Sequence, residues 1–286
     1  MIAVTGASGA LGRLVIERLL GTEAPSSIRA LARSPEKIAD LAARGVEVVE
    51  ADYDRPETLT PALTGVDRLL LVSSSEVGKR APQHRAVIEA ARAAGVGLIA
   101  YTSILNIDSS PMILAEEHRE TEAMLAGYPG TVVLLRNGWY LENYFGDVAA
   151  ALAHGAVAGT SGEGRISAAA RSDYADAAAA VLRDPPATST THELAGDTGF
   201  TRAELAAEIG RQTGREIAFA NMGEAEFAAL LVKAGLPEGF AAVVADADAA
   251  AGKGALYSDS TALSTLAGHP TKTLEAAVRE ALTAAG

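Results

Sequence analysis

Short apolar runs alternate with amphipathic helical patterns through the first half of the chain. The runs are nearly continuous, as in strands that are buried on both faces of a parallel sheet. Right-handed crossovers between such strands predict an α/β fold with a doubly wound, Rossmann-type parallel sheet. The predicted strands are 2–5, 28–32, 46–50, 68–72, 97–101 and 131–136, and the predicted helices between them are 11–20, 35–44, 56–63, 81–94 and 113–126.

The pattern changes after residue 136. An aromatic cluster is followed by a Gly/Ala/Ser-rich stretch at 155–170, and from residue 201 the pattern is mostly helical. A helix at 173–182 and a strand at 191–194 are expected to rejoin the main sheet. A short strand is predicted at 217–220, and the alanine-rich segment 240–251 is predicted to be a helix. We therefore expect residues 1–136, with 171–195, to form one domain, and 137–170 with 196–286 to form a smaller, mostly helical C-terminal lobe.

A glycine-rich turn joins the first predicted strand to the first predicted helix, with the sequence Gly6-Ala7-Ser8-Gly9-Ala10-Leu11-Gly12. In a dinucleotide-binding turn, the first glycine allows the tight bend and the second lets the backbone approach a pyrophosphate. The third packs helix against strand, and the helix N-terminus directs free N–H groups at the phosphates. The spacing is G-x-x-G-x-x-G, and a plain tight turn is the alternative. The position between strand and helix favours dinucleotide binding.

Arg33 ends the second predicted strand, where NAD enzymes place an acid for the ribose hydroxyls and NADP enzymes place a cation for the 2′-phosphate. Its guanidinium offers a bidentate fork for a phosphate. Lys37, in the next predicted helix, could add a second positive charge for the 2′-phosphate. We interpret Arg33 as a sign of NADP(H), the alternative being a solvated arginine at a strand end.

Polar residues follow the third and fourth predicted strands. Asp52 could accept a hydrogen bond from the adenine amino group, although aspartates also start turns and cap helices. Ser73, Ser74 and Ser75 lie where ligands bind in such sheets, beyond the carboxyl ends of the strands. Their small side chains would let a cofactor lie close to the backbone, although an ordinary serine-rich turn is possible.

The catalytic Tyr-x-x-x-Lys pair of standard short-chain dehydrogenases is absent, because no tyrosine in the chain has a lysine four residues later. Tyr101 is followed at that spacing by Leu105, and Tyr140 by Tyr144. The usual general acid for an alcohol–ketone pair is therefore missing. No catalytic residue is predicted.

Four of the chain's thirteen aromatic residues, Trp139, Tyr140, Tyr144 and Phe145, fall within seven positions after the sixth predicted strand. Flat rings suit stacking against a nicotinamide or a flat substrate. We predict that Trp139, Tyr140, Asn143 and Tyr144 contact substrate. A core patch between the two lobes is the alternative.

Composition narrows the partners. The chain has 286 residues, no cysteine and a formal net charge of −12. The negative charge disfavours nucleic acid and anionic membranes, so we predict neither partner. The lack of cysteine excludes disulfides and thiolate catalysis and is compatible with the cytosol, so we expect a cytoplasmic protein. Met1 begins a strand, which leaves no room for a signal peptide.

The five histidines are scattered without ligand spacing, so no metal site is predicted. The segment Glu116-Glu117-His118 is predicted to lie on the solvated face of its helix. Asp173 is interpreted as a helix cap, and Arg171 and Tyr174 are candidates for the lining of the cleft.

Taken together, G-A-S-G-A-L-G, Arg33, S-S-S-E-V-G, Y-T-S and R-N-G-W-Y-L-E-N resemble the atypical short-chain dehydrogenases of the NmrA-like type. The resemblance spans the whole chain and is strongest to the bacterial NADPH:quinone oxidoreductases of that fold. It implies NADPH binding, and this family also lacks the Tyr–Lys pair. With Asp52, the predicted cofactor-binding residues are Gly6, Ala7, Ser8, Gly9, Ala10, Leu11, Gly12, Arg33, Ser73, Ser74, Ser75, Asn137, Gly138, Trp139, Tyr140, Leu141, Glu142, Asn143 and Arg171.

The expected activity is direct hydride transfer from NADPH to a quinone without flavin or metal, because an electron-poor ring needs proximity and stacking more than a strong acid. A non-catalytic NADP(H) sensor and a reductase of another electron-poor alkene or carbonyl are the alternatives. We expect a monomer or a homodimer.

Overall fold

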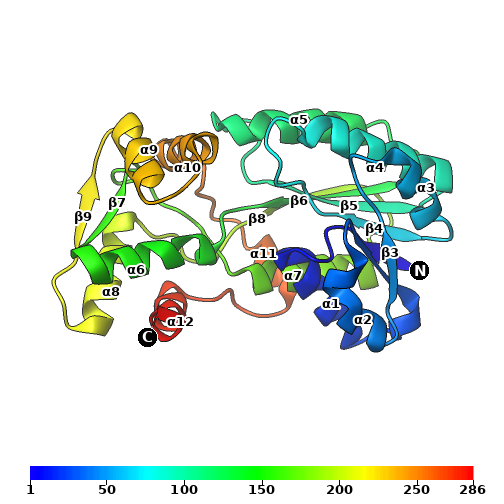
Figure 1. The fold of residues 1–286 in the computed structure, drawn as a ribbon, viewed down its shortest axis with the longest axis horizontal. Coiled ribbons are helices and arrows are strands. Elements are labelled where there is room, and N and C mark those ends of the chain that lie inside the picture. Colours follow the sequence, from blue (N-terminus) through cyan, green and yellow to red (C-terminus); the bar gives the residue numbers. More distant parts are fainter. Residues whose placement is uncertain (286) are drawn as a thin grey trace.

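A seven-stranded parallel sheet forms the larger part of the computed structural model, which describes residues 1–285 (Figure 1). The strand order is β3-β2-β1-β4-β5-β6-β8. The order in which strands are added reverses between β1 and β4, and this is the switch point of a doubly wound sheet. The predicted fold class is confirmed. The strands are β1 (Ile2–Val4), β2 (Ile28–Ala32), β3 (Glu47–Glu50), β4 (Arg68–Leu71), β5 (Leu98–Ile104), β6 (Thr131–Asn137) and β8 (Thr190–Leu194).

Helices cover both faces of this sheet (Figure 1). On one face, α1 (Ala10–Leu20), α2 (Ala39–Ala43), α7 (Arg171–Arg183) and α11 (Ala262–Ala267) pack with Val4, Ala30 and Leu70. On the other, α3 (Pro56–Leu63), α4 (Arg80–Ala94) and α5 (Ile113–Leu125) pack with Ala3, Leu69 and Tyr101. Alternate residues of each strand therefore enter opposite cores, which explains the continuous apolar runs.

The second lobe has its own core beside the carboxyl ends of the strands (Figure 1). It contains a parallel pair, β7 (Ala156–Gly159) and β9 (Ala218–Asn221). Its helices are η3 (Leu141–Tyr144), α6 (Phe145–His154), α8 (Arg202–Thr213), α9 (Glu224–Lys233), α10 (Glu238–Ala251) and α12 (Leu274–Ala285). The alanine-rich helix is confirmed as α10. The strand β7 was not predicted, because Val157 is the only large apolar residue in it.

Two predicted elements differ in detail. The helix expected at 35–44 is a 3₁₀ turn, η2 (Pro35–Ile38), followed by the short α2. Ile38 at the end of η2 and Leu41 in α2 both enter the core. The strand predicted to end at Tyr101 runs on to Ile104, because β5 stays paired with β6 up to the Ile104–Asn137 partners. A further 3₁₀ turn, η1 (Pro25–Ser27), precedes β2.

Candidate functional site: a cleft at the carboxyl ends of β1, β2 and β4

The glycine turn has the geometry that its sequence predicts. Gly6 has φ +58°, and the Gly9 N–H donates to the Gly6 carbonyl at 2.8 Å. A Cβ at Gly12 would lie 2.4 Å from the Gly6 oxygen, so only glycine lets α1 pack this tightly on the turn. The α1 N-terminus has no side-chain cap and no first-turn acid. Its first N–H groups lack intrahelical acceptors, so they fit an anionic phosphate.

The turn opens onto a cleft of about 430 Å³ at the switch point of the sheet. Thirteen of the predicted cofactor residues line it: Gly6, Ser8, Gly9, Ala10, Leu11, Gly12, Arg33, Asp52, Ser73, Ser74, Ser75, Tyr140 and Arg171. Seven do not: Ala7, Asn137, Gly138, Trp139, Leu141, Glu142 and Asn143. Their roles in binding stay predictions.

Arg33 lies at one end of the cleft with its side chain 63 % exposed. Its Nη1 is 2.8 Å from Glu76 Oε1, and Glu76 Oε2 is 3.2 Å from Lys79 Nζ. Lys37 is exposed and is not among the cleft residues. A guanidinium at the end of β2 matches the position expected for a 2′-phosphate contact.

The Ser73–Ser75 loop is held by side chains from the surrounding elements. Ser73 N donates to Thr102 Oγ1 at 2.8 Å, and Ser74 N donates to His84 Nε2 at 2.9 Å. Arg80 Nε donates to the Ser74 carbonyl at 2.9 Å. The backbone of this loop is therefore held in place where it lines the cleft.

His84 is a buried, neutral acceptor in this arrangement. Its Nε2 accepts from Ser74, so its Nδ1–H donates to Thr121 Oγ1 at 2.9 Å. Burial, and then the nearby Arg80 guanidinium, lowers the pKa of His84 to about 3. The sequence pattern does not reveal this histidine's role, because its partners are brought together only by the packing of α4 on α5.

The predicted solvated face at 116–118 is wrong for two of its three residues. His118 is buried, with Nδ1 2.6 Å from the Tyr101 hydroxyl. Glu117 Oε2 pairs with the buried Arg80 at 3.1 Å. Only Glu116 is exposed. The face of α5 that packs on α4 carries polar residues, so hydrophobicity alone misassigned it.

Seven residues line the cleft without having been predicted: Ala32, Ala51, Tyr53, Val72, Glu76, Arg80 and Gln83. Tyr53 directly follows Asp52, and its hydroxyl lies 2.5 Å from Thr5 Oγ1 beneath the turn. Asp52 itself accepts from Asp54 N at 3.0 Å, as in a turn. Tyr53 lies close to the end of a predicted strand, and this position is the signal that could have identified it.

At the other end of the cleft, Arg171 lies over the ring of Tyr140, with Cζ 4.6 Å from the ring centroid. Arg171 Nη2 donates to Asn143 Oδ1 at 2.8 Å. Glu142 accepts from the Arg171 backbone N–H at 3.0 Å. Burial raises the pKa of Tyr140. This end of the cleft therefore offers an aromatic ring and a cation side by side.

Tyr144 is not among the residues that line the cleft, and its predicted contact with substrate stays a prediction. It is only 4 % exposed and packs edge-on against Phe200, with centroids 5.5 Å apart. The Arg202 guanidinium lies over its ring at 5.3 Å. For this ring, burial and packing favour the alternative of a core patch.

Asp173 caps α7 from its third position, because Oδ2 accepts from Ala170 N at 3.1 Å. Its neighbours Asp176 and His269 offer atoms within 4.8 Å of it and of one another. However, Lys272 N also donates to Asp173 Oδ2, and Arg18 pairs with Asp176 at 2.6 Å. These carboxylates already serve the fold.

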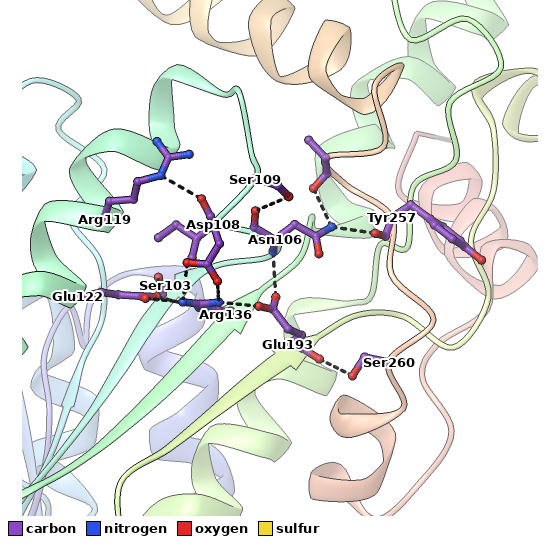
Figure 2. A network of polar contacts seen from close by, with 12 residues as sticks. Ser103, Asn106, Asp108, Ser109, Arg119, Glu122, Arg136, Glu193, Tyr257 and Ser260 are labelled. Carbon is purple, nitrogen blue, oxygen red and sulfur yellow. Dashed lines mark hydrogen bonds and ion pairs between the residues drawn. The ribbon is translucent and has the colours of Figure 1, made fainter. Parts of the chain in front are cut away.

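A second polar network lies at the carboxyl ends of β5, β6 and β8 (Figure 2). Arg136 contacts Glu122, Glu193 and Asp108 at 2.7–2.8 Å. Asn106 has φ +54°. Its Nδ2 donates to the Tyr257 carbonyl at 2.8 Å, and its backbone N–H donates to Glu193. This network fastens the sheet to the second lobe.

Comparisons with known proteins support the interpretation of the cleft as a dinucleotide-binding site. The NAD(P)H-binding family model matches residues 6–185. Quinone oxidoreductase 2 of Escherichia coli (strain K12) is 53 % identical over 97 % of both chains. The crystal structure of an Escherichia coli NADPH-dependent quinone oxidoreductase complexed with NADPH aligns with TM-score 0.96 and 52 % identity, covering 99 % of this chain and 100 % of that one. Triphenylmethane reductase of Citrobacter sp., complexed with NADP(H), aligns with TM-score 0.94 and 35 % identity, covering 98 % and 100 %.

Among residues 1–285, no helix has both the length and the apolar character needed to cross a membrane.

Proposed function

We propose that this chain, which belongs to the NmrA-like family of NAD(P)H-binding proteins, is an NADPH-dependent quinone oxidoreductase that uses neither flavin nor metal. The observation that carries the proposal is the likeness over nearly the whole chain to an NADPH-complexed quinone oxidoreductase, combined with Arg33 at the end of β2 in the cleft.

The lining of the cleft supports an arrangement for NADPH. The pyrophosphate meets the N–H groups of the α1 N-terminus, and the 2′-phosphate meets Arg33. Asp52 serves the adenine, and Ser73–Ser75 approach the dinucleotide through their backbone. The nicotinamide end then lies toward Tyr140 and Arg171.

When bound, NADPH supplies the hydride, and the chain's residues position the two rings. Tyr140 is half-buried beside the cleft and offers one face for a flat substrate. Trp139 directly precedes it, and Asn143 follows three residues later. A quinone accepts a hydride to form a stabilised phenolate, which takes its proton from water or a nearby hydroxyl. The Tyr140 hydroxyl is protonated at neutral pH even at the ordinary pKa of a tyrosine, and burial raises that pKa further. This chemistry accounts for an enzyme without a Tyr–Lys pair.

The division of labour belongs to the same proposal: residues 1–136 with 171–195 bind the cofactor, and 137–170 with 196–286 shape the substrate side, apart from α11, which packs on the sheet. We also propose a cytoplasmic location, supported by the cysteine-free composition, and a monomer or homodimer.

The test is steady-state oxidation of NADPH and of NADH with a simple benzoquinone, alongside calorimetric binding of each cofactor. Arg33→Ala should narrow the preference for NADPH by about ten- to a hundredfold, because one charge-assisted contact is lost. Arg55→Ala is the matched control, since Arg55 is also exposed and ion-paired but lies outside the cleft. If the chain binds NADPH but turns over no quinone, the sensor hypothesis replaces the enzyme hypothesis. Equal affinity for NADH and NADPH would show that Arg33 does not recognise the 2′-phosphate.

A further inference from the structure

Arg33 meets a carboxylate from across the cleft. It follows β2, whereas Glu76 follows β4, and both line the cleft. The Nη1–Oε1 distance of 2.8 Å is that of a charge-assisted hydrogen bond. The cation expected to bind the 2′-phosphate therefore already has an anionic partner within the chain.

The backbone of Glu76 is well fixed. Its N–H donates to Ser74 Oγ at 3.2 Å, and its carbonyl accepts from Lys79 N at 3.1 Å. The same loop is held from α4 by His84 and Arg80. The Glu76 side chain is 30 % exposed and that of Arg33 is 63 % exposed, so the arginine is the more accessible member of the pair.

A phosphate dianion that reaches Arg33 must share the guanidinium with this carboxylate or displace it. Either way, two anions come close together on one cation, and Lys79 compensates only one oxygen of Glu76. A dinucleotide without the 2′-phosphate makes no such demand.

We propose that Glu76 is a specificity-determining residue that competes with the 2′-phosphate for Arg33 and so limits the affinity for NADP(H). The inference rests on the proposed function, because it takes Arg33 as the 2′-phosphate ligand. It implies that the chain binds NADP(H) less tightly than its cleft allows, which favours release of the cofactor in both redox forms.

The test uses Glu76→Gln, which keeps the shape of the side chain and removes its charge. The probes are adenosine 2′,5′-bisphosphate and AMP, which differ only in the 2′-phosphate, with each dissociation constant measured by calorimetry. We expect the bisphosphate to bind about three- to tenfold more tightly to the variant, the scale of an exposed ion pair plus repulsion, and AMP to change by less than about twofold.

Two further variants make the result specific. Glu50→Gln removes the same charge from an exposed carboxylate that is paired with Arg55 at 2.6 Å outside the cleft, and it should leave both probes unaffected. In an Arg33→Ala background, Glu76→Gln should lose most of its effect, because the shared cation is gone.

Weaker binding of the bisphosphate to Glu76→Gln would show that Glu76 orients Arg33 and would overturn the proposal. An equal gain with both probes, or with Glu50→Gln, would overturn it as a general charge effect. If the unmodified chain binds both probes equally, the assignment of Arg33 fails and this inference falls with it. If the unmodified chain prefers the bisphosphate but Glu76→Gln changes nothing, only the role of Glu76 fails.

Discussion

Two regions at the same edge of the sheet use similar residues for opposite purposes. At the ends of β1, β2 and β4, the helix N–H groups, Arg33 and the serine loop face a cleft. At the ends of β5, β6 and β8, Arg136 is enclosed by three carboxylates and Asn106 holds the second lobe (Figure 2). Polar residues at strand ends can bind a ligand where they face a cleft. Where they form hydrogen bonds and ion pairs with one another, they hold parts of the fold together.

The two arginines show the contrast most clearly. The Arg136 side chain is 11 % exposed, against 63 % for Arg33. Burial alone would lower the pKa of Arg136, but its hydrogen bonds to Glu122, Glu193 and Asp108 raise it overall. Arg136 is therefore a fixed charge of the fold, whereas Arg33 can exchange its one partner for a ligand.

The largest expected effect comes from breaking the enclosed network. Arg136→Met should lower the free energy of unfolding by about 3–5 kcal/mol, because it leaves the nearly buried Glu122 carboxylate without its cation. Urea denaturation measures this change, and NADPH affinity should hold within about twofold. Arg55→Met, at an exposed pair, should cost less than about 1 kcal/mol. A comparable loss in both variants would erase the contrast between the two regions.

The next effect comes from the open region and acts on binding. Gly9→Val should weaken NADPH by about a hundredfold or more, since a side chain at the α1 N-terminus blocks the approach of the pyrophosphate. A Cβ at Gly9 meets only the Gly6 oxygen, at 3.2 Å, so the unfolding free energy should change little. Gly12→Ala should instead destabilise the fold, because its Cβ would lie 2.4 Å from that oxygen. Normal NADPH titration of Gly9→Val would mean that the turn is only structural.

The smallest effect concerns the support beneath the serine loop. The pKa of His84 is about 3 in the fold and about 6.5 when unfolded, so below pH 6.5 the unfolded chain binds the extra proton. Stability should therefore fall as pH drops from about 6.5 toward 3, by about 1 kcal/mol between pH 6.5 and 5.5 from this histidine. Urea unfolding at the two pH values should show a shallower loss in His84→Gln. An unchanged slope would mean that His84 is not held neutral.

The cleft residues that could be predicted are those whose positions follow from a short stretch of sequence. The glycine turn and Arg33 owe their positions to one strand and the residues next to it, and the doubly wound order puts those strand ends together. Arg80 and His118 were missed because their partners, Glu117 of α5 and Tyr101 of β5, come from other elements, through packing that no local pattern shows. Tyr144 shows the same limit: it follows Tyr140 by only four residues, but its ring packs in the core of the second lobe and does not line the cleft.

The position of β8 at the edge of the sheet has a consequence for biosynthesis. Strand β6 pairs with β8 on its outer side, yet residues 138–170 of the second lobe are synthesised between them. A nascent chain that has already formed the first six strands thus carries an unpaired edge at β6, open to wrong partners, until Thr190–Leu194 leaves the ribosome. The two lobes are interleaved in the order of translation, so the first can be completed only after part of the second has been made.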